Sequence, residues 1–139
     1  MDAGIYTVNI TDDNSCTSVN TAPLTISEPA AVSGSILSQT NVLCFGSGTG
    51  SVTIDGAGGI GPYTYNIDAG AFGASGTFND LAAGPHTVQV KDSNGCTSNV
   101  AVTITQPASA VSGTNTSQTN LLCFGTGTGS VTVVGSGGT

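Results

Sequence analysis

Residues 83–98 read Ala-Gly-Pro-His-Thr-Val-Gln-Val-Lys-Asp-Ser-Asn-Gly-Cys-Thr-Ser, and residues 3–18 read Ala-Gly-Ile-Tyr-Thr-Val-Asn-Ile-Thr-Asp-Asp-Asn-Ser-Cys-Thr-Ser. The two stretches align without a gap, at an offset of 80 residues (83 against 3). In each, apolar residues alternate with polar ones and an Asp-x-Asn turn follows, which is the pattern of a half-buried strand that enters a hairpin. The repeated strand and turn predict a β protein built from internal repeats.

A second pair of stretches repeats at almost the same distance. Residues 44–53 read Cys-Phe-Gly-Ser-Gly-Thr-Gly-Ser-Val-Thr, and residues 123–132 read Cys-Phe-Gly-Thr-Gly-Thr-Gly-Ser-Val-Thr, an offset of 79 (123 against 44). One unit is therefore about 80 residues long, with boundaries expected at Pro29 and Pro107. The predicted organisation is the end of one repeat at 1–29, a complete repeat at 30–107 and the start of the next at 108–139. We expect the chain to be part of a longer array.

Within the complete repeat, six short segments are predicted to be strands, because their apolar residues alternate and glycine-rich or Asn-Gly turns separate them. A helical apolar period is not found in the sequence. Six or seven short strands in about 80 residues predict an all-β fold of tandem immunoglobulin-like antiparallel β-sandwiches. The predicted strands are Val32–Leu37, Ser51–Asp55, Pro62–Ile67, Gly76–Leu81, Thr87–Lys91 and Asn99–Thr105.

The charge balance of the 139-residue, 13.5 kDa chain excludes several classes of partner. Eight acidic residues face a single base, Lys91, for a net charge of −7. Binding of nucleic acid or of an anionic membrane surface needs clustered Lys and Arg, so neither is expected. No apolar run approaches the ~18 residues of a membrane-spanning helix. The expected partners are neighbouring repeats of the same chain and copies of itself in a filament.

Four cysteines in a chain without a Cys-x-x-Cys pair predict disulfides in an extracellular setting rather than a zinc or redox site. Cys44–Cys96 is the simplest bridge, because both residues belong to one repeat. Two alternatives remain open: bridges between neighbouring repeats in series, or the pairs Cys16–Cys44 and Cys96–Cys123 folded back around the boundary prolines. A unit this small buries a thin core, so a staple worth roughly 2–4 kcal/mol is expected.

The order of these anchors resembles the SprB-type repeat of very large surface adhesins from gliding bacteria that use type IX secretion. The anchors are the Cys-Phe-Gly stretch at 44, Gly-Pro-Tyr-Thr-Tyr at 61–65, the 83–96 strand and turn, and Val-Thr-Ile-Thr-Gln-Pro at 102–107. The resemblance implies a secreted, cell-surface location and a stalk or filament, and it carries no ligand site. His86 stands where the family usually has Tyr, which the first repeat keeps as Tyr6.

No residue pattern predicts catalysis, so the chain is not expected to be an enzyme. His86 is the single imidazole, and a ring packed near the domain edge, similar to a tyrosine corner, explains it better than a general base. Asp55, the best-placed lone carboxylate, is replaced by Val134 in the next repeat. The Gly46–Gly50 stretch lacks the lysine and helix of a phosphate loop and predicts a turn.

Three further features have a structural and a functional interpretation. The acidic turns 12–14 and 92–95 favour Asx-turn chemistry, with calcium at a turn or repeat junction, together with Glu28, as the lesser alternative; no other cofactor is expected. Tyr63 and Tyr65 are predicted to be core residues before sugar-stacking ones. The N-glycosylation patterns at Asn9 and Asn115 are expected to be idle in a bacterial protein.

The sequence thus predicts a structural segment of a secreted cell-surface filament or adhesin stalk, with roles in gliding or surface attachment. The alternative is a glycan- or surface-binding immunoglobulin-like module.

Overall fold

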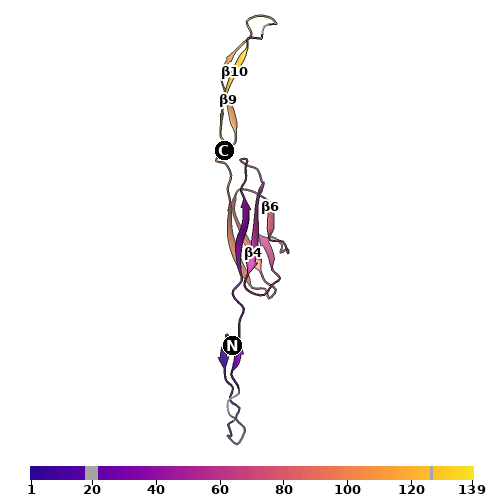
Figure 1. Cartoon of the computed structure of the whole chain (residues 1–139), viewed down its shortest axis with the longest axis vertical. Coiled ribbons are helices and arrows are strands. Elements are labelled where there is room, and N and C mark those ends of the chain that lie inside the picture. Colours follow the sequence, from indigo (N-terminus) through magenta and orange to yellow (C-terminus); the bar gives the residue numbers. More distant parts are fainter. Residues whose placement is uncertain (18–21, 126) are drawn as a thin grey trace. The chain divides into compact units, whose positions relative to one another are not determined.

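The computed structural model describes residues 1–17, 22–125 and 127–139, which form two compact units, Met1–Ala31 and Val32–Thr139 (Figure 1). The described residues contain β-strands and turns but no helix, which confirms the predicted all-β class. None of their elements is a helix that could cross a membrane. The predicted boundary at Pro29 lies two residues before the division between the units, and the boundary at Pro107 stays a prediction.

Six strands in the second unit form the complete β-sandwich, in two three-stranded antiparallel sheets. All six coincide with predicted segments, with ends that differ by at most three residues. One sheet has the order β3-β4-β6 and the other the order β5-β7-β8. The strands are β3 (Ser33–Thr40), β4 (Gly50–Ala57), β5 (Thr64–Ile67), β6 (Thr77–Leu81), β7 (Gly84–Lys91) and β8 (Thr97–Ile104).

This strand order is that of the immunoglobulin family of sandwiches. If β3 to β8 are read as strands A, B, C, E, F and G, the sheets are A-B-E and C-F-G, the constant-type arrangement without strand D. The sandwich of residues 33–104 is called the central module below. The alternating apolar pattern of the strands explains the sandwich, because only one face of each sheet has to be buried.

The core of the central module lies between the two sheets. Val52 and Ile54 of β4 face Val88 and Val90 of β7, and each of these side chains is at most 3% exposed. The remaining buried apolar residues come from the loop after β3 and from β5, β6 and β8: Val42, Tyr65, Leu81, Val102 and Ile104. The prediction that Tyr65 is a core residue is confirmed, and Tyr63 packs against the same cluster.

Gly34 lets β3 approach the opposite sheet closely. A Cβ atom at this position would lie 2.7 Å from a methyl group of Val90 and 2.7 Å from one of Val100, closer than carbon atoms pack. In the sequence this glycine weakens the strand prediction. The structure shows what the glycine contributes, since the absence of a side chain lets β3 pack directly on the β7–β8 hairpin.

Two further hairpins flank the central module in the sequence. β1 (Gly4–Tyr6) pairs with β2 (Leu24–Ile26), and β9 (Ser112–Thr119) pairs with β10 (Ser130–Ser136). The β1–β2 register, Tyr6 opposite Leu24, is that of His86 opposite Val102 in β7–β8. The β9–β10 register repeats that of β3–β4, down to a bulge at the same place.

Candidate functional site

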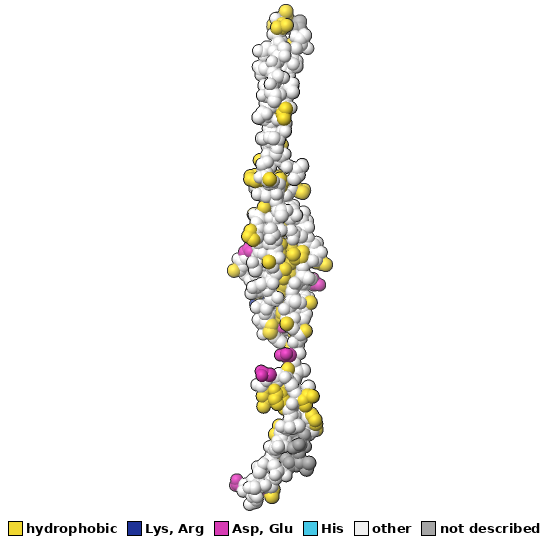
Figure 2. Space-filling view, turned by 90° about the vertical axis from the view of Figure 1, so that its left-hand side faces the viewer, with side chains coloured by type: hydrophobic (Ala, Val, Ile, Leu, Met, Phe, Trp, Pro, Cys, Tyr) yellow, Lys and Arg dark blue, Asp and Glu magenta, His cyan; other side chains and the backbone are white. Residues whose placement is uncertain are grey.

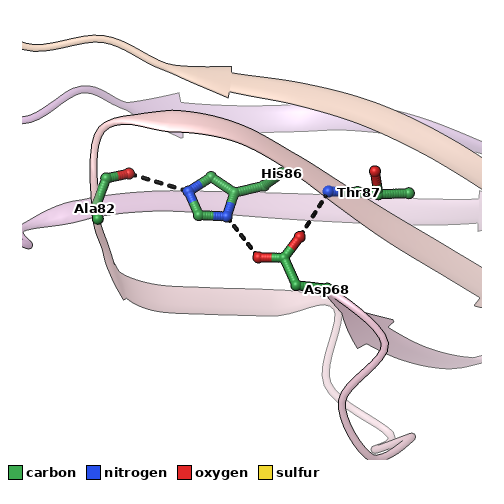
Figure 3. A network of polar contacts seen from close by, with 4 residues as sticks. All are labelled: Asp68, Ala82, His86 and Thr87. Carbon is green, nitrogen blue, oxygen red and sulfur yellow. Dashed lines mark hydrogen bonds and ion pairs between the residues drawn. The ribbon is translucent and has the colours of Figure 1, made fainter.

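A polar network joins the end of β5 to the start of β7 at one edge of the central module (Figure 3). The His86 Nδ1 atom lies 2.7 Å from Oδ2 of Asp68, and its Nε2 atom lies 3.0 Å from the carbonyl oxygen of Ala82. The backbone N–H of Thr87 donates to the other carboxylate oxygen of Asp68 at 2.9 Å. The His86 side chain is 13% exposed, whereas that of Asp68 is 51% exposed.

Both ring nitrogens of His86 face oxygen acceptors, so only the doubly protonated ring donates to both. The hydrogen bond to the Ala82 carbonyl, followed by that to Asp68, raises the pKa of His86 above its ordinary value. The hydrogen bond from His86, followed by that from the Thr87 amide, lowers the pKa of Asp68. The contacts of the pair therefore favour the charged forms of both side chains.

The geometry at His86 is that of a structural corner. Its Nε2 atom bonds to the carbonyl four residues upstream, and in the first unit the Tyr6 hydroxyl donates to the carbonyl of Asp2, also four residues upstream, at 2.6 Å. Tyrosine corners of immunoglobulin-like domains use the same bond at the start of strand F. The two rings therefore tie the turn before this strand to the strand itself, as their matching sequence positions predict.

The acidic turn after β7 is built around one buried carboxylate. Asp92 is 4% exposed; its Oδ1 accepts from the amides of Asn94 (3.0 Å) and Cys96 (2.8 Å), and its Oδ2 accepts from that of Ile60 (3.0 Å). These bonds lower the pKa of Asp92, the one from Ile60 most of all. The turn therefore has the Asx chemistry that the sequence predicts.

The first unit repeats this turn around Asp12. Its Oδ1 accepts from the amides of Asn14 (3.0 Å) and Cys16 (2.8 Å), at the positions that match those around Asp92. In the described ranges, no group of three or more His, Cys, Asp or Glu side chains is placed to hold a metal ion. Calcium at these turns, the lesser alternative above, thus gains no support from the arrangement of the carboxylates.

Cys44 and Cys96 lie in loops at opposite ends of the central module. The backbone N–H of Val42 donates to the carbonyl of Thr105 at 2.9 Å, so the loop that contains Cys44 lies at the C-terminal end of β8. Cys96 directly precedes β8 and therefore lies at its N-terminal end. An eight-residue strand spans ~26 Å, far beyond the ~7 Å that a disulfide tolerates between Cα atoms. The structure thus does not bring Cys44 and Cys96 together in one module. Cys16, Cys44 and Cys96 are exposed free thiols, and Cys123 is also exposed.

The glycine-rich stretch after Cys44 is a turn, as predicted. The backbone N–H of Gly46 donates to the side-chain oxygen of Gln106 at 2.8 Å, and that of Ser47 donates to the carbonyl of Cys44 at 3.1 Å. The first bond ties the loop between β3 and β4 to the chain that leaves β8, and the second closes the turn itself.

A shallow groove of about 560 Å³ on the outer face of the β5-β7-β8 sheet is a second candidate for a binding site. Its wall includes the Phe72 ring, on which the Lys91 ammonium lies 3.7 Å from the centroid. Gln89 donates to Asn99 across its floor at 3.1 Å. The other lining side chains are mostly polar: Asn66, Asp68, Ala69 and Thr87, with Gly70.

Sequence reasoning missed this groove. The tyrosines that it considered for sugar stacking point elsewhere: the Tyr63 hydroxyl donates to Gly58 at 2.5 Å, and the Tyr65 hydroxyl accepts from Gly56 at 3.2 Å. A signal was available, because Thr87 and Gln89 alternate with the buried valines of β7 and must face outward. The place of Phe72 beside them depends on the loop after β5, which has no periodic pattern.

Comparison with known families finds one match, over part of the central module. The family model described as the SprB repeat matches residues 36–72, which run from β3 through β5 into the following loop. No curated protein and no solved structure matches the chain. The match supports the resemblance drawn from the Cys-Phe-Gly and Gly-Pro-Tyr-Thr-Tyr anchors, both of which lie inside it.

Proposed function

Because residues 36–72 match the SprB repeat, we propose that this chain is a structural segment of a secreted cell-surface filament or adhesin stalk. SprB repeats belong to surface-exposed secreted proteins, so the proposal places the segment outside the cell, where it provides length in an appendage for attachment or gliding. The uncharged polar surface with scattered acidic side chains fits this setting (Figure 2). The proposal includes no enzymatic activity.

The observation that carries the proposal is where the chain enters and leaves the central module. Val42, just after β3, donates to Thr105, just after β8, so these two strands end together and run in the same direction. The chain therefore enters at the end where β3 begins and leaves at the opposite end. Such a module adds its full strand length of ~26 Å to a linear array.

The same geometry determines how a pulling force acts on the module. Tension at the two ends draws β3 and β8 past each other, because they run in parallel and leave at opposite ends. The hydrogen bonds that resist this sliding include Val42 to Thr105, the Gln39 side chain to the Thr103 carbonyl at 2.8 Å, and the Thr105 amide to the Asn41 side chain at 3.1 Å. Bonds loaded side by side have to break together, so we expect the module to unfold in one step.

Single-molecule force spectroscopy on the whole chain, held near Met1 and Thr139, tests this function. The 72 residues from Ser33 to Ile104 (104 − 33 + 1) should release about 22 nm in one event, from ~3.4 Å per residue less the folded length. Gln39→Ala should lower the unfolding force, and Gln89→Ala, on the outer face of the other sheet, should leave it unchanged. Gradual extension without a discrete event would contradict the stalk function.

A second candidate function is glycan binding at the groove beside Phe72. A ring next to the amides of Gln89 and Asn99 offers a stacking surface and hydrogen-bond donors, the combination that sugars require. A glycan array probed with the whole chain tests it. Phe72→Ala should abolish any signal, whereas Phe45→Ala, at a 49% exposed ring in the loop after β3, should preserve it. An array without signal would eliminate this candidate.

A further inference from the structure

The outer face of the β5-β7-β8 sheet carries a row of three amide side chains. Asn66 of β5 lies opposite Gln89 of β7, and Gln89 lies opposite Asn99 of β8. Residues at opposite positions of an antiparallel pair have their Cβ atoms about 5 Å apart on the same face of the sheet. The row therefore crosses the full width of the sheet and forms the floor of the groove of about 560 Å³.

Two of the three amides keep hydrogen-bonding groups for a ligand. Asn66 is 6% exposed, and its Nδ2 atom donates to the Gly70 carbonyl at 3.2 Å, so this amide holds the loop after β5 in place. Gln89 donates through Nε2 to Oδ1 of Asn99 at 3.1 Å. In the part of the chain that the structure describes, no hydrogen bond engages the Gln89 oxygen or the Asn99 amine. The floor thus offers an acceptor beside a donor, which is what a sugar hydroxyl group needs.

Lys91, whose counterpart in the first repeat is Thr11, brings the single Lys or Arg of the chain to the same face. It follows Gln89 by two residues along β7, so both side chains point outward, about 7 Å apart along the strand. Its ammonium lies 3.7 Å from the centroid of the Phe72 ring, which lines the groove. No carboxylate in the described ranges forms an ion pair with Lys91. A cation–π contact therefore holds the ammonium at the rim of the groove with its charge unpaired.

Two carboxylates near this face leave the charge of Lys91 uncompensated. Asp92, the next residue, is 4% exposed, and backbone amides donate to both of its oxygens. Asp68 binds the amide of Thr87, which lies four residues from Lys91 along β7 and hence about 13 Å away along the strand. That separation exceeds the Debye length of ~8 Å at physiological ionic strength. The groove therefore has a positive end at Lys91 and a negative end at Asp68, whose orientation Figure 3 shows.

We propose that the groove binds a sugar residue with a carboxylate attached directly to its ring, as in uronic acids and sialic acids. The carboxylate pairs with the Lys91 ammonium, and ring hydroxyl groups bond to the amides of Gln89 and Asn99. At the other end, the carboxylate of Asp68, which is 51% exposed, accepts from a further hydroxyl group. The inference rests on glycan binding at the groove, the second candidate function above, and adds the class of glycan.

The size and charge of the protein narrow the class of glycan further. A groove of about 560 Å³ lies within the range of roughly 300–1,000 Å³ that small-ligand sites occupy, so it holds a short stretch of a glycan. Eight acidic residues against one Lys give a net charge of −7, which repels a glycan with sulfate on every ring. A glycan with single carboxylates on otherwise uncharged rings avoids this repulsion and still engages Lys91.

NMR titration of the isotope-labelled whole chain tests the proposal with two pairs of ligands that differ in charge: a galacturonate oligosaccharide and its methyl ester, and sialyllactose and its methyl ester. The side-chain amide signals of Gln89 and Asn99 should shift, and at least one carboxylated sugar should bind about fivefold or more tightly than its ester, which cannot pair with Lys91. Equal affinities within both pairs would overturn the proposal and leave glycan binding in place. Absence of binding by all four ligands would overturn both.

Substitutions separate the charge of Lys91 from the hydrogen bonds of the amide row, and the same spectra report whether each variant is folded. Lys91→Gln should lower the affinity for the carboxylated sugar to that for its ester, whereas Lys91→Arg, which keeps the charge and the contact with Phe72, should retain the preference. Gln89→Ala should weaken binding of sugar and ester alike, and Asn79→Ala, at an exposed amide of β6 in the other sheet, should weaken neither. A preference that survives Lys91→Gln would assign the carboxylate to another group and overturn the proposal.

Discussion

At the scale of single residues, ionisable side chains form hydrogen bonds with backbone groups in the turns. His86 and Asp92 bind backbone groups rather than a ligand: His86 the carbonyl of Ala82, and Asp92 the amides of three residues. Tyr6 and Asp12 repeat the same bonds in the first unit. A polar residue that recurs at the same position of each repeat therefore forms the same hydrogen bonds with the backbone in each.

His86 makes the stability of the central module depend on pH. Its folded-state pKa is raised, so its stabilising contribution is complete below the unfolded value near 6.5 and is lost as pH rises through the folded value. We expect the free energy of urea unfolding to fall as the pH rises above about 6.5. His86→Tyr, which copies Tyr6, should remove this fall while keeping the bond to the Ala82 carbonyl. An unchanged pH dependence in that variant would contradict the assignment.

At the scale of elements, the strand register and the close approach of β3 to the opposite sheet explain how strands with small side chains form a sandwich. β3, the first strand of the central module, approaches the opposite sheet this closely only because Gly34 has no side chain. The bulge in β3–β4 recurs at the same place in β9–β10. Bulges bend a strand and increase its twist. The hairpin, and not the single strand, is thus the unit that the repeat preserves.

Gly34→Val should destabilise the central module by about 1–3 kcal/mol, because the new side chain would overlap methyl groups of Val90 and Val100. Urea unfolding followed by circular dichroism measures the loss. Gly73→Ala is the matched control, since a Cβ at that position has nothing within 4 Å. Equal stability of the two variants would show that β3 does not pack as closely as described.

At the scale of the whole molecule, the same alternating pattern of apolar residues is buried in one part of the chain and exposed in another. In the central module, alternating valines are buried by the facing sheet, whereas in β9–β10 the corresponding residues are half exposed or more. Burial of apolar area stabilises by about 25 cal/mol per Å², so most of the stability of the chain comes from the central module.

Paired substitutions at matching positions measure this difference. Val52→Ala should cost about 2–3 kcal/mol, from two lost methyl groups and the cavity that they leave. Val131→Ala should change the unfolding free energy of the central module by less than about 0.5 kcal/mol at low protein concentration. Urea unfolding of the two variants provides the comparison, and similar losses would show that the β9–β10 face is covered under these conditions.

The sequence by itself determined the repeated pattern, the six strands and the inward faces of the strands, but it did not predict that Val42 and Leu81 belong to the core. These are local properties: a side-chain period of two assigns each residue to a face, and Gly or Asn-Gly marks each turn. It also placed His86 and Tyr6 at equivalent corners, because aligned repeats put equivalent residues in equivalent backbone positions.

Only the tertiary structure decided which distant segments meet. The distance between Cys44 and Cys96 depends on the direction in which β8 runs relative to the β3–β4 loop, and the groove beside Phe72 depends on how an irregular loop folds over β7. Neither relation is written in a local period. Both arise because two sheets can bury their apolar faces only by packing on each other, and that packing brings together residues that are far apart in the chain.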